Sequence, residues 1–356
     1  MVKIVITENE AGQRLDRFLK KYLRNAPLSY IYKAIRKDVK VNGRRVGIDA
    51  PVAVGDEIAI YISDGEAAAF RARRTGHKAK RQFGIAYEDD SILIAEKPLG
   101  LLTHGDSAEK KNTLANQVAG YLAERGEYRP GDGATFSPSP VNRLDRNTTG
   151  LVVFGKSYAA LQDLNLMIRE RRFIRKFYLT IVKGEMRGDL LLKDLMRKDR
   201  ESNMVEIVGG GQRPGDAGED ARMMETAARV MESAGGYSLV EIELITGRTH
   251  QIRAQMAEAG FPVIGDPKYG DRRENAGIAA SYGLCTQFLH AHRLVFGDCE
   301  GRLAYLKGLE VVAPLPDGME RIRAAMFGGR QGRSREGRAG REANKGGAGL
   351  CGRSGR

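Results

Sequence analysis

The chain has 356 residues, a formal net charge of +13 and an apolar content of 42%. Because this length exceeds what one compact core normally holds, we expect two or more domains, and the apolar content excludes a chain that is disordered throughout. No run approaches the ~18 consecutive apolar residues of a membrane span and no apolar leader follows Met1, so we expect a cytoplasmic protein without a membrane contact. The basic excess favours a polyanionic partner.

Residues 1–62 are predicted to form a small α/β domain. Four of its segments carry periodic patterns: helical spacing at 14–23 and 29–37, a hairpin around Asn42-Gly43 at 39–46, and a strand at 54–62. The polar positions of these segments include cations that a polyanionic partner would contact: Arg14, Arg17, Lys33, Arg36 and Arg44.

The rest of the chain divides into three segments by composition. Residues 63–82 are poor in large apolar side chains and rich in Arg and Lys, which indicates a basic linker. Residues 83–327 mix strand and helix patterns without regular βαβ alternation, so we predict an α+β domain. Its expected strands are 91–97, 150–156, 176–185 and 237–245, and its expected helices are 114–125, 159–170 and 249–260. Residues 328–356 are a Gly/Arg-rich tail that we predict to be disordered.

The first segment that could carry chemistry is 140–157, where a charged loop runs directly into a strand. Asp145 lies in this loop between Arg143 and Arg146. Nearby cations favour the ionised carboxylate, and an ionised carboxylate in a dry pocket can act as a nucleophile. A surface Asp–Arg pair or an Asx-type turn would explain the same residues.

Two further segments combine charge with apolar periodicity. In 245–270, Thr249 can cap a helix that puts His250 and Arg253 on one face, where the arginine could pair with a buried carboxylate, although a solvated amphipathic helix is the simpler interpretation. His250 has no His or Cys at metal-ligand spacing, so we predict no metal site. In 171–185, five cations are interleaved with three aromatic residues. This pattern is typical of a site that stacks bases and binds phosphates, and equally of a strand with one buried and one solvent-exposed face.

These segments together resemble the RluA-type pseudouridine synthases. The family signature HRLD, followed by a TSG-like tripeptide, corresponds to Asn142-Arg143-Leu144-Asp145 and Thr148-Thr149-Gly150. Further matching segments are 87–104, 175–185, 247–253 and 288–296, in the family's order over about 85–316, while 13–62 resembles an S4 RNA-binding domain. The resemblance implies the pseudouridine synthase fold, a mixed and largely antiparallel sheet with flanking helices.

The resemblance also implies roles for particular residues. Asp145 corresponds to the family's catalytic carboxylate, which opens the reaction that breaks the N1–C1′ bond of uridine before the uracil reattaches through C5. Tyr178 corresponds to an aromatic that stacks on the flipped uracil, and Arg253 to the basic partner of the catalytic Asp. Arg143 corresponds to a residue that holds the nucleotide out of its helix. The remaining predicted RNA contacts of the catalytic domain are Arg146, Arg248 and His250. The resemblance implies neither a cofactor nor a metal.

One departure and two alternatives accompany this interpretation. Asn142 stands where the family usually has His, and its amide can still donate and accept hydrogen bonds. We expect a monomer that modifies uridines in large-subunit ribosomal RNA. A synthase acting on transfer RNA, and a catalytically silent S4-type factor in ribosome assembly, are the alternatives.

Overall fold

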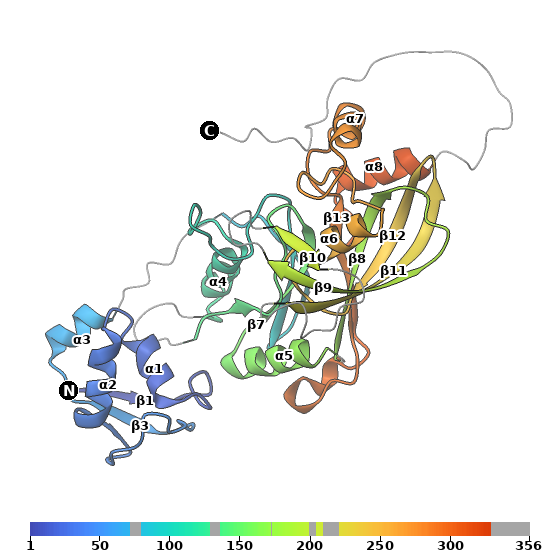
Figure 1. The fold of residues 1–356 in the computed structure, drawn as a ribbon. Coiled ribbons are helices and arrows are strands. Elements are labelled where there is room, and N and C mark those ends of the chain that lie inside the picture. Colours follow the sequence, from blue (N-terminus) through green and yellow to red (C-terminus); the bar gives the residue numbers. More distant parts are fainter. Residues whose placement is uncertain (72–79, 129–135, 172, 199–203, 209–220, 329–356) are drawn as a thin grey trace.

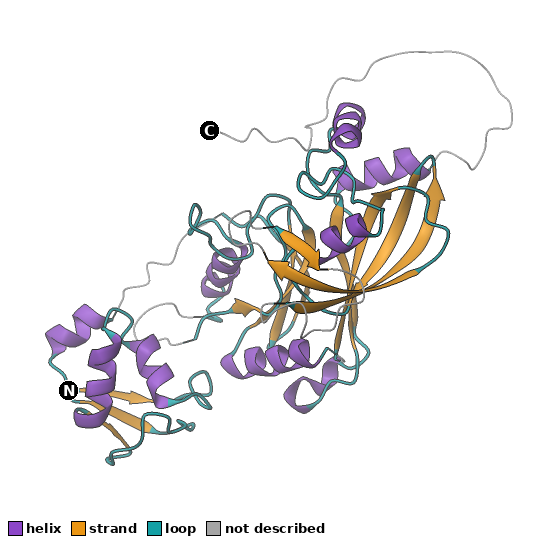
Figure 2. Cartoon of the chain, viewed as in Figure 1, coloured by secondary structure: helices purple, strands orange, loops and turns teal. Residues whose placement is uncertain are grey.

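The computed structural model describes residues 1–71, 80–128, 136–171, 173–198, 204–208 and 221–328, which form two bodies with separate sheets (Figure 1). The N-terminal body has a three-stranded antiparallel sheet in the order β1-β3-β2, with helices packed against it (Figure 2). Its elements are β1 (Val2–Val5), α1 (Leu15–Tyr22), α2 (Leu28–Lys37), β2 (Val39–Val41), β3 (Glu57–Ile60) and α3 (Asp64–Phe70).

The two helices predicted in this body are confirmed as α1 and α2. Leu15, Phe18 and Leu19 are at most 1% exposed, as expected for the apolar stripe of a helix that covers a sheet. The predicted turn is also present, because Asn42 and Gly43 both have positive φ and the backbones of Val41 and Arg44 bond to each other in both directions. The second arm of the hairpin is a single bridge at Arg44, and β2 pairs with β3 instead.

The segment predicted as a linker begins with a helix. Ser63 and Glu66 form a capping box, which supplies partners for the free N–H groups at the start of α3. Ala67 is buried in the N-terminal core, and the Arg71 guanidinium lies 4.6 Å from the Tyr22 ring centroid. The N-terminal body therefore extends to about residue 71 rather than 62. The centre of the predicted linker, 72–79, and nearly all of the predicted tail lie outside the described residues.

The second body is built on an eleven-stranded mixed sheet, which confirms the α+β prediction. The main strand order is β10-β9-β11-β12-β8-β13-β7-β5-β4, with β14 beside β13 and β6 beside β7. Among the described strands of this sheet, every pairing is antiparallel except that of β13 with β7. The strands are β4 (Gly84–Glu88), β5 (Ile92–Lys97), β6 (Ser139–Pro140), β7 (Thr149–Gly155), β8 (Ile174–Lys183), β9 (Leu190–Lys198), β10 (Val205–Val208), β11 (Arg222–Ala234), β12 (Tyr237–Leu244), β13 (Leu289–Phe296) and β14 (Glu310–Val312). The helices are α4 (Leu114–Glu124), α5 (Tyr158–Glu170), α6 (Gln251–Glu258), α7 (Arg272–Tyr282), α8 (Asp317–Phe327) and the 3-10 helix η1 (Gly301–Leu306).

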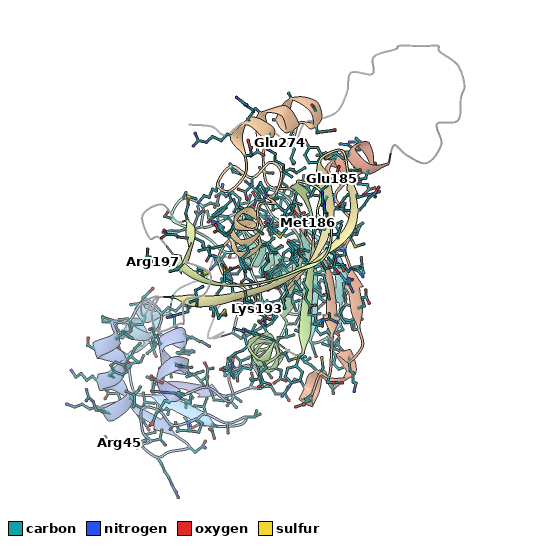
Figure 3. All side chains as sticks on the ribbon, turned by 45° about the vertical axis from the view of Figure 1, so that its right-hand side comes forward. Arg45, Glu185, Met186, Lys193, Arg197 and Glu274 are labelled. Carbon is teal, nitrogen blue, oxygen red and sulfur yellow. The ribbon has the colours of Figure 1, made fainter. Side chains whose placement is uncertain are left out.

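Both faces of this sheet are covered, and side chains fill the space beneath the covering helices (Figure 3). Leu93 packs in the cluster that includes α4 and α6, whereas its neighbours Ile92 and Ile94 pack in the cluster that includes α5 and η1. This alternation follows from the two-residue period of a strand. All seven residues of β7 are buried, which explains the unbroken apolar run that predicted it. No helix in the described ranges is long and apolar enough to cross a membrane.

Candidate active site

Asp145 lies in the short loop that leads into β7. The Thr103 hydroxyl donates to the Leu144 carbonyl at 3.0 Å and accepts from the Leu144 N–H at 3.2 Å, which fixes one side of Asp145. The Thr148 N–H donates to the Asp145 carbonyl at 3.0 Å and fixes the other side. The Asp145 side chain remains 33% exposed. The loop thus presents a carboxylate to solvent from a rigid support.

Gly150 makes this position of the loop possible. It has φ +111°, and a Cβ there would collide with the Ala291 carbonyl. Ala291 belongs to β13, and Gly150 pairs with it in the parallel contact between β7 and β13. Only glycine allows the two backbones to approach this closely. The last residue of the TSG-like tripeptide is therefore required by the sheet that carries Asp145.

Lys97 anchors the same loop from beneath. Lys97 is 1% exposed, and its ammonium group donates to the carbonyls of Pro98, Leu101 and Arg146 at 3.1, 2.7 and 3.0 Å. Burial lowers the pKa of Lys97 to about 7, although the Asp145 carboxylate acts in the opposite direction. Three backbone acceptors on one ammonium tie β5 to the residue that follows Asp145.

Arg253 on α6 joins Asp145 to a second carboxylate. Its Nη1 donates to Asp145 Oδ2 at 3.0 Å, while its Nε and Nη2 donate to Asp266 Oδ2 and Oδ1 at 2.6 and 2.8 Å. Arg253 is 4% exposed and Asp266 is 0% exposed. Burial opposes ionisation of Asp266, yet its pKa lies below the usual value because the hydrogen bonds and charge of Arg253 outweigh burial. The site therefore holds one guanidinium between two carboxylates.

His250 lies beside this group rather than within the helix. Its backbone is left-handed at φ 52°, and it is the residue that precedes α6, so the predicted cap at Thr249 is wrong. Its Nε2 is 3.8 Å from Asp145 Oδ2, and its Nδ1 is 3.1 Å from the hydroxyl of Tyr269. Burial lowers the pKa of His250, although Asp145 acts in the opposite direction. A residue predicted to contact RNA thus lies next to the carboxylate.

Tyr178 approaches the site from β8. It is 5% exposed and packs in the same cluster as Leu144 and Ile252. Burial raises the pKa of Tyr178 far above its usual value, and the charge of Asp145 adds to this shift. The phenol therefore stays protonated at neutral pH. The structure brings together the three residues predicted from separate motifs: Asp145, Tyr178 and Arg253.

Apart from His250, the predicted RNA contacts lie on the surface in both bodies. Arg143, Arg146 and Arg248 are exposed near Asp145, and Arg146 pairs with Asp106 at 3.4 Å. The predicted cations of the N-terminal body are likewise exposed: Arg14, Arg17, Lys33, Arg36 and Arg44. Exposure leaves these cations available to phosphates, and none of them lies within the Arg253 cluster.

The aromatic residues of 171–185 belong to the core. Phe173 packs in the cluster that includes α5 and η1, and Phe177 points to the opposite face of β8 from Tyr178, so neither is placed to stack on a base at Asp145. The guanidinium groups of Arg175 and Arg293 lie 4.9 and 3.8 Å from the Phe177 ring centroid. Tyr178 is the one aromatic of this segment next to the site. Its neighbours serve packing.

Asn142 serves the sheet. Its side-chain amide donates to the Leu151 carbonyl at 3.1 Å and accepts from the Val153 N–H at 2.9 Å. These two bonds continue the ladder beside β7. The replacement of the family's usual His therefore affects a backbone contact, and the Asn142 amide satisfies it.

Sequence reasoning missed Asp266 and Tyr269. Both lie in Gly265-Asp266-Pro267-Lys268-Tyr269-Gly270, a turn that follows α6. Two features of the sequence could have indicated Asp266. It lies between a glycine and a proline, which is typical of a turn, and it follows closely after Arg253, for which a buried carboxylate partner was predicted. Among the described residues, no group of three or more His, Cys, Asp or Glu side chains is arranged to hold a metal ion.

Comparisons with known proteins place this site in a family. Residues 91–258, which include Asp145, Tyr178 and Arg253, match the family model described as RNA pseudouridylate synthase. Ribosomal large subunit pseudouridine synthase C of Vibrio vulnificus (strain CMCP6) is 32% identical over 326 residues, which cover 90% of this chain and 95% of the relative. The protein of the same name from Escherichia coli (strain K12) is 33% identical over 327 residues, with the same two coverages.

The fold has a solved counterpart in the human protein RNA Pseudouridylate Synthase Domain Containing 4. The two structures align with a TM-score of 0.52 and 21% identity, over 67% of this chain and 93% of the human one. At this identity the likeness concerns the fold. Because relatives 32–33% identical over 90% of the chain agree with the family model, the chain belongs to the RNA pseudouridylate synthase family and is a pseudouridine synthase.

Proposed function

We propose that this pseudouridine synthase acts on large-subunit ribosomal RNA and that Asp145 is its nucleophile. The observation that carries the proposal is the pairing of a partly exposed Asp145 with a buried Arg253 at 3.0 Å. A carboxylate must be ionised and reachable to attack a nucleotide. The hydrogen bond from Arg253 orients the carboxylate, and the exposed side of Asp145 gives the nucleotide access.

The surroundings of Asp145 suit a flipped uridine. Taking a base out of its stack costs a few kcal/mol, which contacts to the flipped base and its phosphates must offset. Tyr178 provides an aromatic surface next to Asp145, and its protonated hydroxyl can donate a hydrogen bond. Arg143 and Arg248 are exposed; Arg143 lies two residues before Asp145, and Arg248 lies two residues before His250, whose Nε2 is 3.8 Å from Asp145 Oδ2. Phosphates of the target strand would pass beside them.

The choice of ribosomal RNA rests on the relatives and on charge. The relatives that match 90% of this chain are both named for the ribosomal large subunit. The net charge of +13 suits a large RNA, because each neutralised phosphate releases counterions. All the site residues described above come from a single chain, in line with a monomer.

Mapping pseudouridines in cells tests the substrate. Ribosomal and transfer RNA from cells with and without this protein would be compared position by position. We expect pseudouridine to disappear from positions in large-subunit ribosomal RNA and from no transfer RNA. Loss confined to transfer RNA would contradict the proposed substrate, and an unchanged map would contradict the proposed activity in the cell.

We assign an S4-type RNA-binding role to residues 1–71. Charge reversal at Arg17 and Arg36, both exposed, should weaken binding to a large-subunit ribosomal RNA transcript. The slope of log affinity against log salt should become shallower by about 1–2. Arg302→Glu, an exposed change on η1 in the other body, is the matched control. Equal effects of the control and of the reversed residues would contradict the assignment.

A further inference from the structure

Arg253 divides its hydrogen bonds unequally between its two carboxylates. Two of its nitrogens bind Asp266 as a fork, and the third, Nη1, donates to Asp145 Oδ2. Among the described residues, no hydrogen bond reaches Asp145 Oδ1. The guanidinium thus contacts one oxygen of Asp145 and leaves the other open.

The loop around Asp266 prevents its carboxylate from moving. Oδ1 accepts from the N–H groups of Lys268 and Tyr269 at 2.8 and 3.1 Å. The Asp266 carbonyl accepts from Asn275 Nδ2 at 2.8 Å, and a Cβ at Gly270 would lie 2.5 Å from the same carbonyl. Asp266 is therefore a fixed and buried anchor for the arginine.

We propose that Asp266 is a positioning residue that holds the fork of Arg253 away from Asp145, so that Oδ1 of Asp145 stays free to bond with the substrate. This inference rests on the proposed role of Asp145 as the nucleophile. The planar guanidinium matches both oxygens of a carboxylate, and such two-point pairs are the strong ones. Without Asp266, the guanidinium charge of Arg253 would be compensated by Asp145 alone, and its planar geometry would allow it to bind both oxygens of Asp145.

The arrangement also requires a charged residue at position 266. Arg253 carries one positive charge, and Asp266 compensates most of it through two short hydrogen bonds. An asparagine would leave that charge to Asp145 alone and would place an N–H group against an arginine nitrogen. The guanidinium would then turn towards Asp145. This would change the orientation of Asp145 but not the residues that bind the RNA.

The test is the activity of full-length Asp266→Asn on a large-subunit ribosomal RNA transcript. A misplacement of about 1 Å at a reacting group costs about 10²-fold, so we expect kcat to fall on that scale. KM should stay within about threefold, because no phosphate contact changes. Asp266→Glu keeps the charge but displaces the carboxylate by one methylene. It should likewise lower kcat and leave KM unchanged, and it provides the test if the asparagine variant does not fold.

Two comparisons separate positioning from a merely structural role. Asn275→Ala loosens the same loop without touching the carboxylate, and it should leave kcat within about threefold. In an Arg253→Lys background the ammonium cannot form a fork, so adding Asp266→Asn should change kcat by less than about threefold. A kcat loss equal in both backgrounds, or equal for Asn275→Ala and Asp266→Asn, would overturn the inference. If Asp145→Asn retained activity, the proposed nucleophile itself would be wrong, whatever Asp266 does.

Lys176 supports a second, independent inference. It lies two residues before Tyr178 on β8, on the same side of the strand, and is only partly exposed. Its Nζ lies 3.7 Å from where a Cβ of Gly247 would be, in the loop that leads to His250. Burial lowers the pKa of Lys176, and the charge of Arg171 lowers it further. Within the described ranges, no carboxylate pairs with this ammonium.

A half-buried cation beside another cation is costly unless an anion joins it. RNA has such an anion at every nucleotide. Lys176 is the neighbour of Tyr178 on the same face of β8, where the RNA backbone next to a flipped base would lie. We infer that Lys176, with Arg171 beside it, binds a phosphate of the RNA next to the target uridine.

Equilibrium binding of a large-subunit ribosomal RNA transcript tests this site, measured in the Asp145→Asn background to prevent turnover. Lys176→Gln should lower affinity and reduce the salt slope by about 0.7–0.9, the value for one phosphate contact. Lys176→Arg should preserve the slope. Lys193→Gln is the matched control, because Lys193 (labelled in Figure 3) already has a partner. Its Nζ pairs with Glu225 Oε1 at 2.9 Å. A slope that Lys176→Gln leaves at its original value would overturn the inference.

Discussion

Replacing Arg253 with methionine removes the cation between two carboxylates and should be among the most damaging single changes to the fold. The side chains of Arg253 and Asp266 are 5% and 0% exposed, so Asp266 would be left as a buried charge without its partner. Breaking a buried pair in this way costs about 3–5 kcal/mol. Methionine has a similar volume, so the lost packing is a small part of that cost.

Urea unfolding measures this cost directly. We expect the free energy of unfolding of Arg253→Met to fall by about 3–5 kcal/mol, and the double variant with Asp266→Leu to recover about half of it or more. Arg302→Met is the control, because Arg302 and Asp163 are 53% and 37% exposed and such pairs contribute about 0–1 kcal/mol. A loss below about 1 kcal/mol for Arg253→Met, or no recovery in the double variant, would refute the reasoning.

Three further predictions concern buried groups. The pKa of Lys97 is about 7 in the folded chain and 10.5 as the ordinary value, so the unfolded chain binds more protons from pH 7 to 10. The free energy of unfolding should therefore rise with pH in this range, by up to about 1.4 kcal/mol per pH unit. Urea unfolding at a series of pH values should show that Lys97→Met lacks this rise. Burial lowers the pKa of His290 from 6.5 to about 4, so the free energy of unfolding should fall by at most about 3 kcal/mol as the pH drops from 6.5 to 4. Thermal unfolding over this pH range should show a smaller decrease in stability for His290→Asn. Asn142→Ala removes two hydrogen bonds to β7 and should cost about 1–3 kcal/mol, whereas Asn142→His should cost less in the same assay.

The proposed catalytic cluster was largely predictable because its members lie in long, ordered motifs. Asp145, Tyr178 and Arg253 come from three segments that no periodic pattern connects, and the resemblance to a family joined them. Residue chemistry alone favoured a surface pair or a turn as the account of Asp145. In the structure Asp145 pairs with the buried Arg253 rather than with an exposed arginine, which supports the proposed role of Asp145.

Asp266 could not be predicted in the same way. It follows Arg253 by thirteen positions through a helix end and a turn, so its contact depends on the tertiary path of the chain. Its neighbours Gly265 and Gly270 mark a tight turn, but a turn does not reveal which side chain points inward. The buried partner expected for Arg253 was real, and there were two carboxylates rather than one.

The boundary of the N-terminal body was missed for a different reason. The sequence of α3 contains three alanines and one phenylalanine, so it lacks the apolar stripe that identifies most helices. Its start depends on the reciprocal bonds of Ser63 and Glu66, a local signal that composition obscures. The single bridge at Arg44 has a similar cause, because turn chemistry specifies the turn and tertiary pairing decides the length of each arm.

The most direct test of the account compares purified wild-type protein with Asp145→Asn on a large-subunit ribosomal RNA transcript. Pseudouridine formed and RNA bound would be measured on the same samples, with Asp163→Asn on α5 as a matched control. We expect Asp145→Asn to form no pseudouridine while its RNA affinity stays within about tenfold, since phosphate contacts and carboxylate chemistry belong to different residues. Product formation by Asp145→Asn at the wild-type rate would contradict the assignment of Asp145 as the nucleophile.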